Sequence, residues 1–247
     1  MIRAPVAPLE EGERDLEGAV AKYLARVLRL RAGDAFVAFD PSAAREADAV
    51  IVAVSEAAVR VRFAAPRAPA IAATREVTWI QGFAKGDKCD AIVRDATELG
   101  ATRVIIAVTQ RSVVKLDGPR ALERAERWRR VALEAARQCG RGDAPTIDGP
   151  CPWNVALASV KSATARFCLY ERATEPLAPP LLAALFQDGP LAFAAGPEGG
   201  LEDAEVAFAR DAGWSIASLG NITLRTETVA AAALGAVRIW TPAVFRR

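Results

Sequence analysis

Histidine is absent from this sequence of 247 residues. Without it the chain lacks the usual general base at neutral pH, the nucleophile systems built on Ser, His and Asp or on Cys and His, and the commonest side-chain metal ligand. Much hydrolase chemistry is therefore excluded, and we expect a site that needs no metal ion.

Cysteine is scarce, and the four cysteines are widely separated with no Cys-x-x-Cys pair. This spacing suits neither a zinc site nor a dense disulfide framework. We therefore expect buried free thiols.

Long apolar runs are missing as well. Residues 104–108 and 229–237 fall well short of the roughly 18 apolar residues that indicate a membrane span. Acidic residues follow the N-terminus in place of the basic start and apolar stretch of a secretory signal. We expect a cytoplasmic protein with no membrane segment.

The formal charge of +2 is too small to indicate nucleic-acid binding, but charge is unevenly distributed. Residues 111–141 hold nine basic side chains against four acidic ones. Such a stretch is either a solvated helix face with i,i+4 ion pairs or a surface that contacts RNA phosphates. A smaller cluster of the same kind contains Lys22, Arg26, Arg29 and Arg31.

The first part of the chain has the pattern of a small β-rich domain, which we place over residues 1–70. Apolar stretches of strand length occupy residues 35–39, 50–54 and 59–63. A segment rich in alanine and proline follows, and it predicts a linker near residues 65–73. The second domain is placed over residues 74–247.

The second part alternates strand and helix patterns. The run at residues 104–108 has the length and branching of a strand buried on both faces, as parallel sheets require. Further strands are predicted at residues 77–83, 166–170, 191–195 and 215–219. Helices are predicted at residues 87–99, 120–138, 179–187, 202–212 and 226–240. The pattern indicates an α/β domain.

Residues 196–201, Gly-Pro-Glu-Gly-Gly-Leu, follow an apolar strand and precede a helix with an acidic first turn. In an open α/β sheet, ligands bind beyond the carboxyl ends of strands, and glycines let a ligand approach the backbone. The loop is therefore either a binding site or a structural turn. Glu198 and the missing Walker lysine argue against a phosphate cradle, so the loop suits a neutral or cationic ligand.

Residues 219–228 again join a strand to a long apolar helix. In one interpretation Thr226 caps that helix, and Arg225 is an incidental surface residue. In the other, Arg225 and Glu227 lie at the edge of the same crevice, where they hold an anionic RNA group and order the site. The convergence of two strand-end loops favours the second interpretation.

The order of these segments resembles the RsmE family of the SPOUT methyltransferases, which methylate N3 of a uridine in bacterial small-subunit ribosomal RNA. The matching segments are residues 27–34, 85–88, 97–100, 110–114, 134–141, 196–201 and 224–228. They span nearly the whole chain, and the last two are the specific ones. The chain departs from the family pattern at Ile222, where an arginine is usual.

The resemblance implies an N-terminal PUA-like β-barrel that helps grip RNA, and a C-terminal SPOUT domain whose deep trefoil knot forms an S-adenosylmethionine pocket. It also implies a homodimer. The residues expected around the cofactor are Leu169, Gly196, Pro197, Glu198, Gly199, Gly200, Leu219, Gly220, Leu224 and Thr226. Those expected to contact ribosomal RNA are Arg29, Arg31, Arg111, Arg137 and Arg141.

By the same resemblance Arg225 and Glu227 are the expected catalytic residues beside the target base. Uridine N3 is protonated at neutral pH, so the site must help remove that proton, hold the resulting anion and aim N3 at the methyl carbon. Arg225 is expected to hold negative charge on the base or on a nearby phosphate. Glu227 either accepts the proton or orients Arg225, and the second is favoured because a carboxylate is a weak base for this acid.

Three other hypotheses stay open at this point. The chain is a non-catalytic RNA-binding or ribosome-assembly factor of the same fold, a SPOUT enzyme that acts on another RNA position, or a nucleotide-phosphate enzyme built on residues 196–201. Methyl transfer to ribosomal RNA separates the first from the leading hypothesis, and labelling at a different nucleotide identifies the second. Affinity for ATP or GTP would identify the third, the nucleotide-phosphate enzyme.

Overall fold

The structure is a computed structural model that describes residues 1–112 and 118–240. The segment matched at residues 110–114 and the basic stretch at residues 111–141 extend beyond the described residues, because Val113, Val114 and Lys115 lie outside them. The last seven residues of the predicted second domain lie outside them as well.

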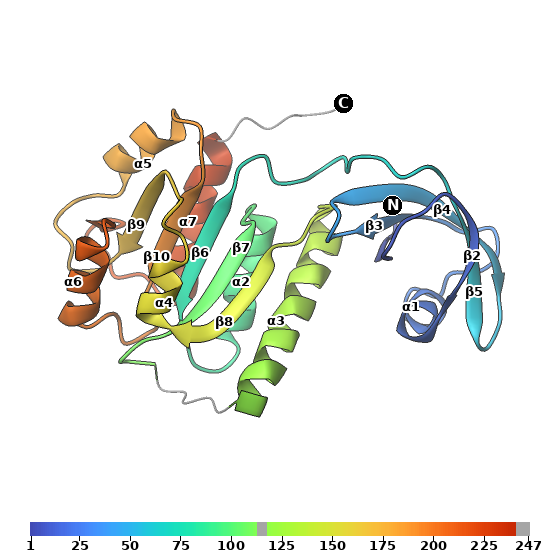
Figure 1. Ribbon diagram of the computed structural model, residues 1–247, viewed down its shortest axis with the longest axis horizontal. Helices are drawn as coiled ribbons and strands as arrows, with labels where there is room; N and C mark the ends of the chain where they lie inside the picture. The colour runs from blue at the N-terminus through green and yellow to red at the C-terminus, as the bar shows by residue number, and fades with distance from the viewer. Residues whose placement is uncertain (113–117, 241–247) are drawn as a thin grey trace. The chain divides into compact units, whose positions relative to one another are not determined.

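Contacts within the chain divide it into two compact units (Figure 1). The first contains Met1–Ala72 and Ala136–Ala144, and the second contains Ala73–Ala135 and Pro145–Arg247. The segment Ala136–Ala144 groups with the first unit, and its Gly142 N–H donates to the Ile71 carbonyl of that unit at 2.8 Å. The segment was predicted to belong to the second domain, since no local pattern indicates a contact between such distant positions.

The first unit contains a five-stranded sheet with the order β1-β3-β4-β5-β2. Its strands are β1 (Arg3–Pro5), β2 (Gly12–Glu17), β3 (Ala35–Asp40), β4 (Arg45–Val54) and β5 (Ala58–Phe63). β1 pairs with β3 in parallel, and the other pairs are antiparallel. A short helix, α1 (Gly18–Lys22), continues into a π-helical turn, η1 (Tyr23–Val27), and contributes Leu24 to the core of the unit.

The three strands predicted in the first unit are β3, β4 and β5, whereas β1 and β2 were not predicted. The sequence of β2, Gly-Glu-Arg-Asp-Leu-Glu, carries too many charges to look like a strand. Two of those charges are paired with β5: Arg60 donates to Asp15 at 2.8 Å, and Arg62 donates to Glu13 at 2.7 Å. Charged side chains are common on an edge strand because one side of it faces water.

The second unit contains a six-stranded parallel sheet with the order β11-β9-β10-β6-β7-β8. Its strands are β6 (Val77–Gly82), β7 (Arg103–Val108), β8 (Thr146–Pro152), β9 (Ala165–Leu169), β10 (Leu191–Ala195) and β11 (Ser215–Ala217). Its helices are α2 (Lys88–Glu98), α3 (Gly118–Cys139), α4 (Trp153–Ala158), α5 (Ala178–Leu185), α6 (Asp203–Asp211) and α7 (Thr226–Trp240). None of the described helices is both long and apolar enough to cross a membrane.

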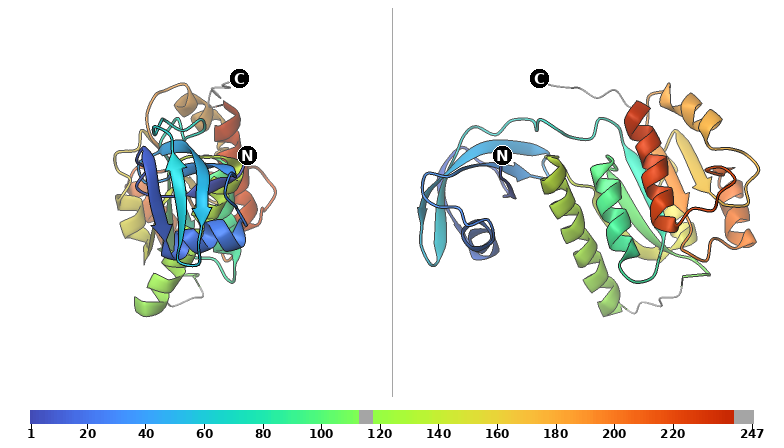
Figure 2. Two further views of the ribbon diagram at one scale, coloured as in Figure 1. Left: turned by 90° about the vertical axis from the view of Figure 1, so that its right-hand side faces the viewer. Right: turned by 180° about the vertical axis from the view of Figure 1, so that it is seen from behind.

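Helices cover both faces of this sheet (Figures 1 and 2). On one face Trp79 and Phe193 pack in a cluster that includes Trp128 of α3 and residues of α2 and α7. On the other face Ile80 packs in a second cluster with Trp153 of α4 and residues of α6. The predicted α/β fold with a parallel sheet is therefore confirmed, and the trefoil knot stays a prediction.

β8 and α4 were not predicted. The sequence of β8 contains two prolines and a glycine, which are unusual in a strand. Proline cannot donate to a sheet, but β8 is an edge strand, where this loss is tolerated. Gly149 interrupts the pairing with β7 at a φ of +92°, and a Cβ there would lie 2.3 Å from the Ile106 carbonyl oxygen. Glycine is therefore required at this irregularity.

Cys89 and Cys168 are buried in the two apolar clusters of the second unit. Burial raises the pKa of each thiol to about 12, so neither ionises to the reactive thiolate at pH 8. We expect a thiol reagent at pH 8 to leave both unmodified in the native protein and to modify both after unfolding. Mass spectrometry of the labelled peptides checks this, and rapid labelling of either residue in the native protein would contradict the described packing.

Candidate active site

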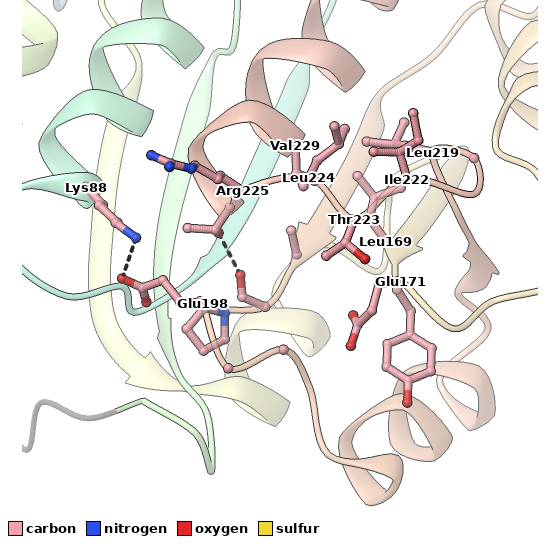
Figure 3. A pocket seen from close by; sticks show the side chains of 18 residues that line it. Lys88, Leu169, Glu171, Glu198, Leu219, Ile222, Thr223, Leu224, Arg225 and Val229 are labelled. Atoms are coloured by element: carbon pink, nitrogen blue, oxygen red, sulfur yellow. Dashed lines mark hydrogen bonds and ion pairs between the residues drawn. The ribbon is translucent and has the colours of Figure 1, made fainter.

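A cavity of about 390 Å³ lies at the carboxyl ends of β9 and β10 (Figure 3). Its wall consists of the end of β9, two loops at residues 196–200 and 219–225, the start of α7, and Lys88 of α2. The carboxyl edge of an open parallel sheet is where such proteins bind ligands. Both strand-end loops singled out in the sequence therefore line one cavity.

The loop at residues 196–200 crosses the end of β6 at very short range. A Cβ at Gly82, the last residue of β6, would lie 2.6 Å from the backbone nitrogen of Pro197. Gly200 has a φ of +72°, and its N–H donates to the Pro197 carbonyl at 2.9 Å, which closes a tight turn. The glycines at these positions are thus required by the backbone path of the loop.

Lys88 forms an ion pair with Glu198, the acidic residue of this loop. Its Nζ lies 3.1 Å from Oε1 of Glu198, as the dashed line in Figure 3 marks, and 3.9 Å from Oε2 of Glu227. Burial favours a raised pKa for Glu198, but hydrogen bonds from the N–H groups of Glu198 and Lys85, together with the Lys88 ammonium, outweigh it and lower that pKa. Glu198 is therefore ionised, and its charge is compensated within the fold.

Arg111 holds the outer side of the same loop. Its guanidinium donates to the Gly199 carbonyl at 2.6 Å and to Glu202 at 2.8 Å. The hydrogen bond from Arg111 to Glu202 raises the pKa of the guanidinium. Glu205 accepts hydrogen bonds from the N–H groups of Gln110 and Glu202, both at 2.9 Å. Two segments far apart in the sequence are thereby joined at the edge of the cavity.

The two loops are also joined in the interior. The Thr226 hydroxyl donates to the Gly196 carbonyl at 2.9 Å, a bond drawn in Figure 3. The amide of Gln81 donates to the same hydroxyl at 2.9 Å and to the same carbonyl at 3.0 Å. Thr226 is the first residue of α7, so the interpretation of its side chain as a helix cap was wrong. Its hydroxyl serves this buried network instead.

Arg225 lines the cavity with an exposed side chain. No hydrogen bond or ion pair engages its guanidinium within residues 1–112 and 118–240. Glu227 lies beside Lys88, and no contact among the described residues joins it to Arg225. The contact in which Glu227 orients Arg225 is thus not present in the structure.

Family models match both parts of the chain. The RNA methyltransferase domain model matches residues 72–238, and the RNA methyltransferase PUA domain model matches residues 16–63. Ribosomal RNA small subunit methyltransferase E of Mycobacterium bovis is 33% identical over 231 residues, which is 92% of this chain and 86% of the relative. The chain belongs to the ribosomal RNA small subunit methyltransferase E family.

Two further relatives carry the same family name. The Bacillus subtilis protein is 34% identical over 160 residues, which is 63% of this chain and 62% of the relative. The crystal structure of the Neisseria gonorrhoeae protein bound to S-adenosyl methionine is 25% identical, has a TM-score of 0.85 and covers 97% of each chain. The resemblance stated from the motifs is confirmed, as is a fold with an N-terminal PUA-like domain.

In this methyltransferase, the ten residues predicted for cofactor binding all line the cavity. The cavity also contains residues that the sequence analysis did not select, and these are Lys88, Tyr170, Glu171, Ala195, Ile222, Thr223 and Val229. Tyr170 and Glu171 directly follow β9, so a search of every strand end would have found them. Lys88 lies in a segment that matched the family, but no role was assigned to it.

The five arginines predicted for RNA have different surroundings. Arg29 and Arg31 are exposed, and Arg137 is partly buried. Arg141 is only 3% exposed, and its guanidinium donates to the carboxylate of Asp143 at 2.6 Å. This burial corrects the assignment of Arg141, because a guanidinium enclosed with its own carboxylate is a structural group. Arg111 is likewise engaged in the loop contacts described above.

The close approach at Gly82 predicts a large effect for Gly82→Ala. The added methyl would meet the backbone of Pro197 at 2.6 Å, so we expect a loss of about 1–3 kcal/mol in the free energy of unfolding. Gly118→Ala is the matched control, because a Cβ there meets nothing within 4 Å. Urea denaturation of the two variants checks this. Equal stabilities would show that the loop does not cross β6 at this distance.

Proposed function

We propose that this methyltransferase transfers the methyl group of S-adenosylmethionine to N3 of a uridine in bacterial 16S ribosomal RNA. The observation that carries the proposal is that both specific motifs line one cavity, with Arg225, unpaired among the described residues, in its wall. The cofactor in the crystal structure of the Neisseria gonorrhoeae relative supports the choice of cofactor. The names of the relatives support small-subunit ribosomal RNA as the substrate.

The lining of the cavity suits this cofactor. Leu169, Leu219 and Leu224 present apolar surface for an adenine ring, and the glycine loop presents backbone donors and acceptors. The carboxylate of Glu171 suits a ligand that carries a sulfonium and an ammonium group, because opposite charges attract at short range. This agrees with the neutral or cationic ligand expected for the loop.

The chain's own groups stabilise the charge that develops at the base. S-adenosylmethionine supplies an electrophilic methyl carbon. Uridine N3 gives up its proton to solvent water and bonds to that carbon, while the electrons of the carbon–sulfur bond remain on sulfur. We propose that Arg225 holds the negative charge of the deprotonated base, since its guanidinium is unpaired among the described residues. Glu227 acts on the site through Lys88, which lies between it and Glu198.

We propose further that Arg29, Arg31 and Arg137 contact RNA phosphates and that the enzyme is a cytoplasmic homodimer. Arg29 and Arg31 are exposed and lie within the segment matched by the PUA domain model. The support for a second subunit is apolar surface at α5 and α7, where Phe186 is 77% exposed and Ile239 is 83% exposed. Large apolar side chains gathered at one place commonly mark an interface.

Replacing Arg225 tests the proposed reaction. We expect Arg225→Ala to lower the rate of methyl transfer by a factor of about 100 to 1,000, because it removes the group that stabilises the anionic base. The affinity for S-adenosylmethionine should stay within about threefold, since the loop backbone that holds the cofactor is unchanged. Transfer of tritium to small-subunit RNA measures the rate, and calorimetry measures cofactor binding.

Arg210→Ala is the control, because Arg210 is an exposed cation in the last turn of α6 and does not line the cavity. Primer extension locates the product, since a methyl group on N3 blocks base pairing. A wild-type protein that binds the RNA without labelling it would be a non-catalytic factor. Labelling at another nucleotide would identify a different RNA target.

A further inference from the structure

Gln81 is a fully buried polar residue in β6, between β10 and β7. Its Oε1 accepts a hydrogen bond from Nε1 of Trp79 at 3.0 Å. Its Nε2 lies within hydrogen-bond distance of three acceptors: the Gly82 carbonyl at 3.0 Å, the Gly196 carbonyl at 3.0 Å and the Thr226 hydroxyl at 2.9 Å. An amide nitrogen carries two hydrogens, so these acceptors share its donors.

Thr226 completes a closed network. Its side chain is nearly inaccessible, and its hydroxyl accepts from Gln81 and donates to Gly196 at 2.9 Å. The Gly196 carbonyl therefore receives two donors, one for each of its lone pairs. Three segments far apart in the sequence are joined at this one carbonyl oxygen.

The two outer segments of this network carry the two halves of the proposed site. Gly196 is the first residue of the loop that lines the cavity with Glu198, Gly199 and Gly200. Thr226 directly follows Arg225 at the start of α7. A buried hydrogen-bond network has one satisfied geometry, and loss of one member leaves the others unpaired. The network therefore fixes the distance between the loop and Arg225.

We propose that Gln81 and Thr226 are positioning residues for methyl transfer, an inference that rests on the proposed function. Through the Gly196 carbonyl they hold the cofactor loop and the Arg225 segment in register, so that the methyl carbon and uridine N3 come into line. Alignment of this kind is demanding, since a misplacement of about 1 Å can cost on the order of 100-fold in rate. Neither side chain touches the reacting atoms in this scheme.

Thr226→Val and Thr226→Ser test the inference as a pair. Valine keeps the shape of threonine and removes the hydroxyl, whereas serine keeps the hydroxyl. We expect Thr226→Val to lower kcat at saturating cofactor and RNA by at least about tenfold and to raise the Kd for S-adenosylmethionine by about tenfold. Thr226→Ser should restore both to within about threefold of the wild type.

Gln81→Met is the second variant, because it keeps the length of the side chain and removes the amide, and the same losses are expected.

Circular dichroism confirms folding, and Thr226→Ala replaces Thr226→Val should the latter not fold. Val and Met variants that melt at a lower temperature but keep kcat and Kd within about twofold of the wild type would overturn the inference, since the network would then be structural only. A wild-type protein that binds no S-adenosylmethionine and methylates no RNA would overturn the proposed function and this inference together.

Discussion

Gly82 ends β6 at the point where Pro197 crosses it, and a side chain at Gly82 would meet the Pro197 backbone at 2.6 Å. β6 and β10 are parallel neighbours, so the loops that follow them leave the sheet at the same edge. The missing side chain lets the β10 loop fold over the end of β6. At this distance the amide of Gln81 reaches both Gly196 and Thr226. The position of the cavity wall therefore depends on a glycine that does not itself line the cavity.

Around the cavity, two ion pairs hold charged side chains in place, while Arg225 has no partner within residues 1–112 and 118–240. Glu198 is compensated by Lys88, and Arg111 is compensated by Glu202. Arg225 has no such partner among the described residues. An unpaired guanidinium at a partly enclosed site favours the binding of an anionic group, because the ion pair then forms only in the complex. An RNA base that becomes anionic during reaction supplies charge of this kind.

Local sequence patterns predicted the central strands of the two sheets and the edge strand β11, but they missed the edge strands β1, β2 and β8. α7 and β10 have the predicted bounds, because a continuous apolar run reports burial directly. β2 and β8 were missed for the opposite reason: charges in β2 are paired across the edge of the first sheet, and prolines in β8 are tolerated at the edge of the second. An edge strand buries only part of its surface, so its sequence need not look like a strand.

The residues of the two strand-end motifs could be predicted to lie together. They line one cavity, since each motif follows a strand and all strands of a parallel sheet present their carboxyl ends at one edge. The bonds that hold those loops could not be found, because adjacent parallel strands are distant in sequence. Gln81 and Thr226 are 145 positions apart, and Arg111 and Glu202 are 91 apart. The resemblance placed Arg111 at the RNA and Thr226 at the cofactor, but it gave no sign of the long-range contacts that both side chains make. The residues that line this cavity lie in short motifs at strand ends, whereas the hydrogen-bond partners that hold those motifs in place lie on distant segments of the chain.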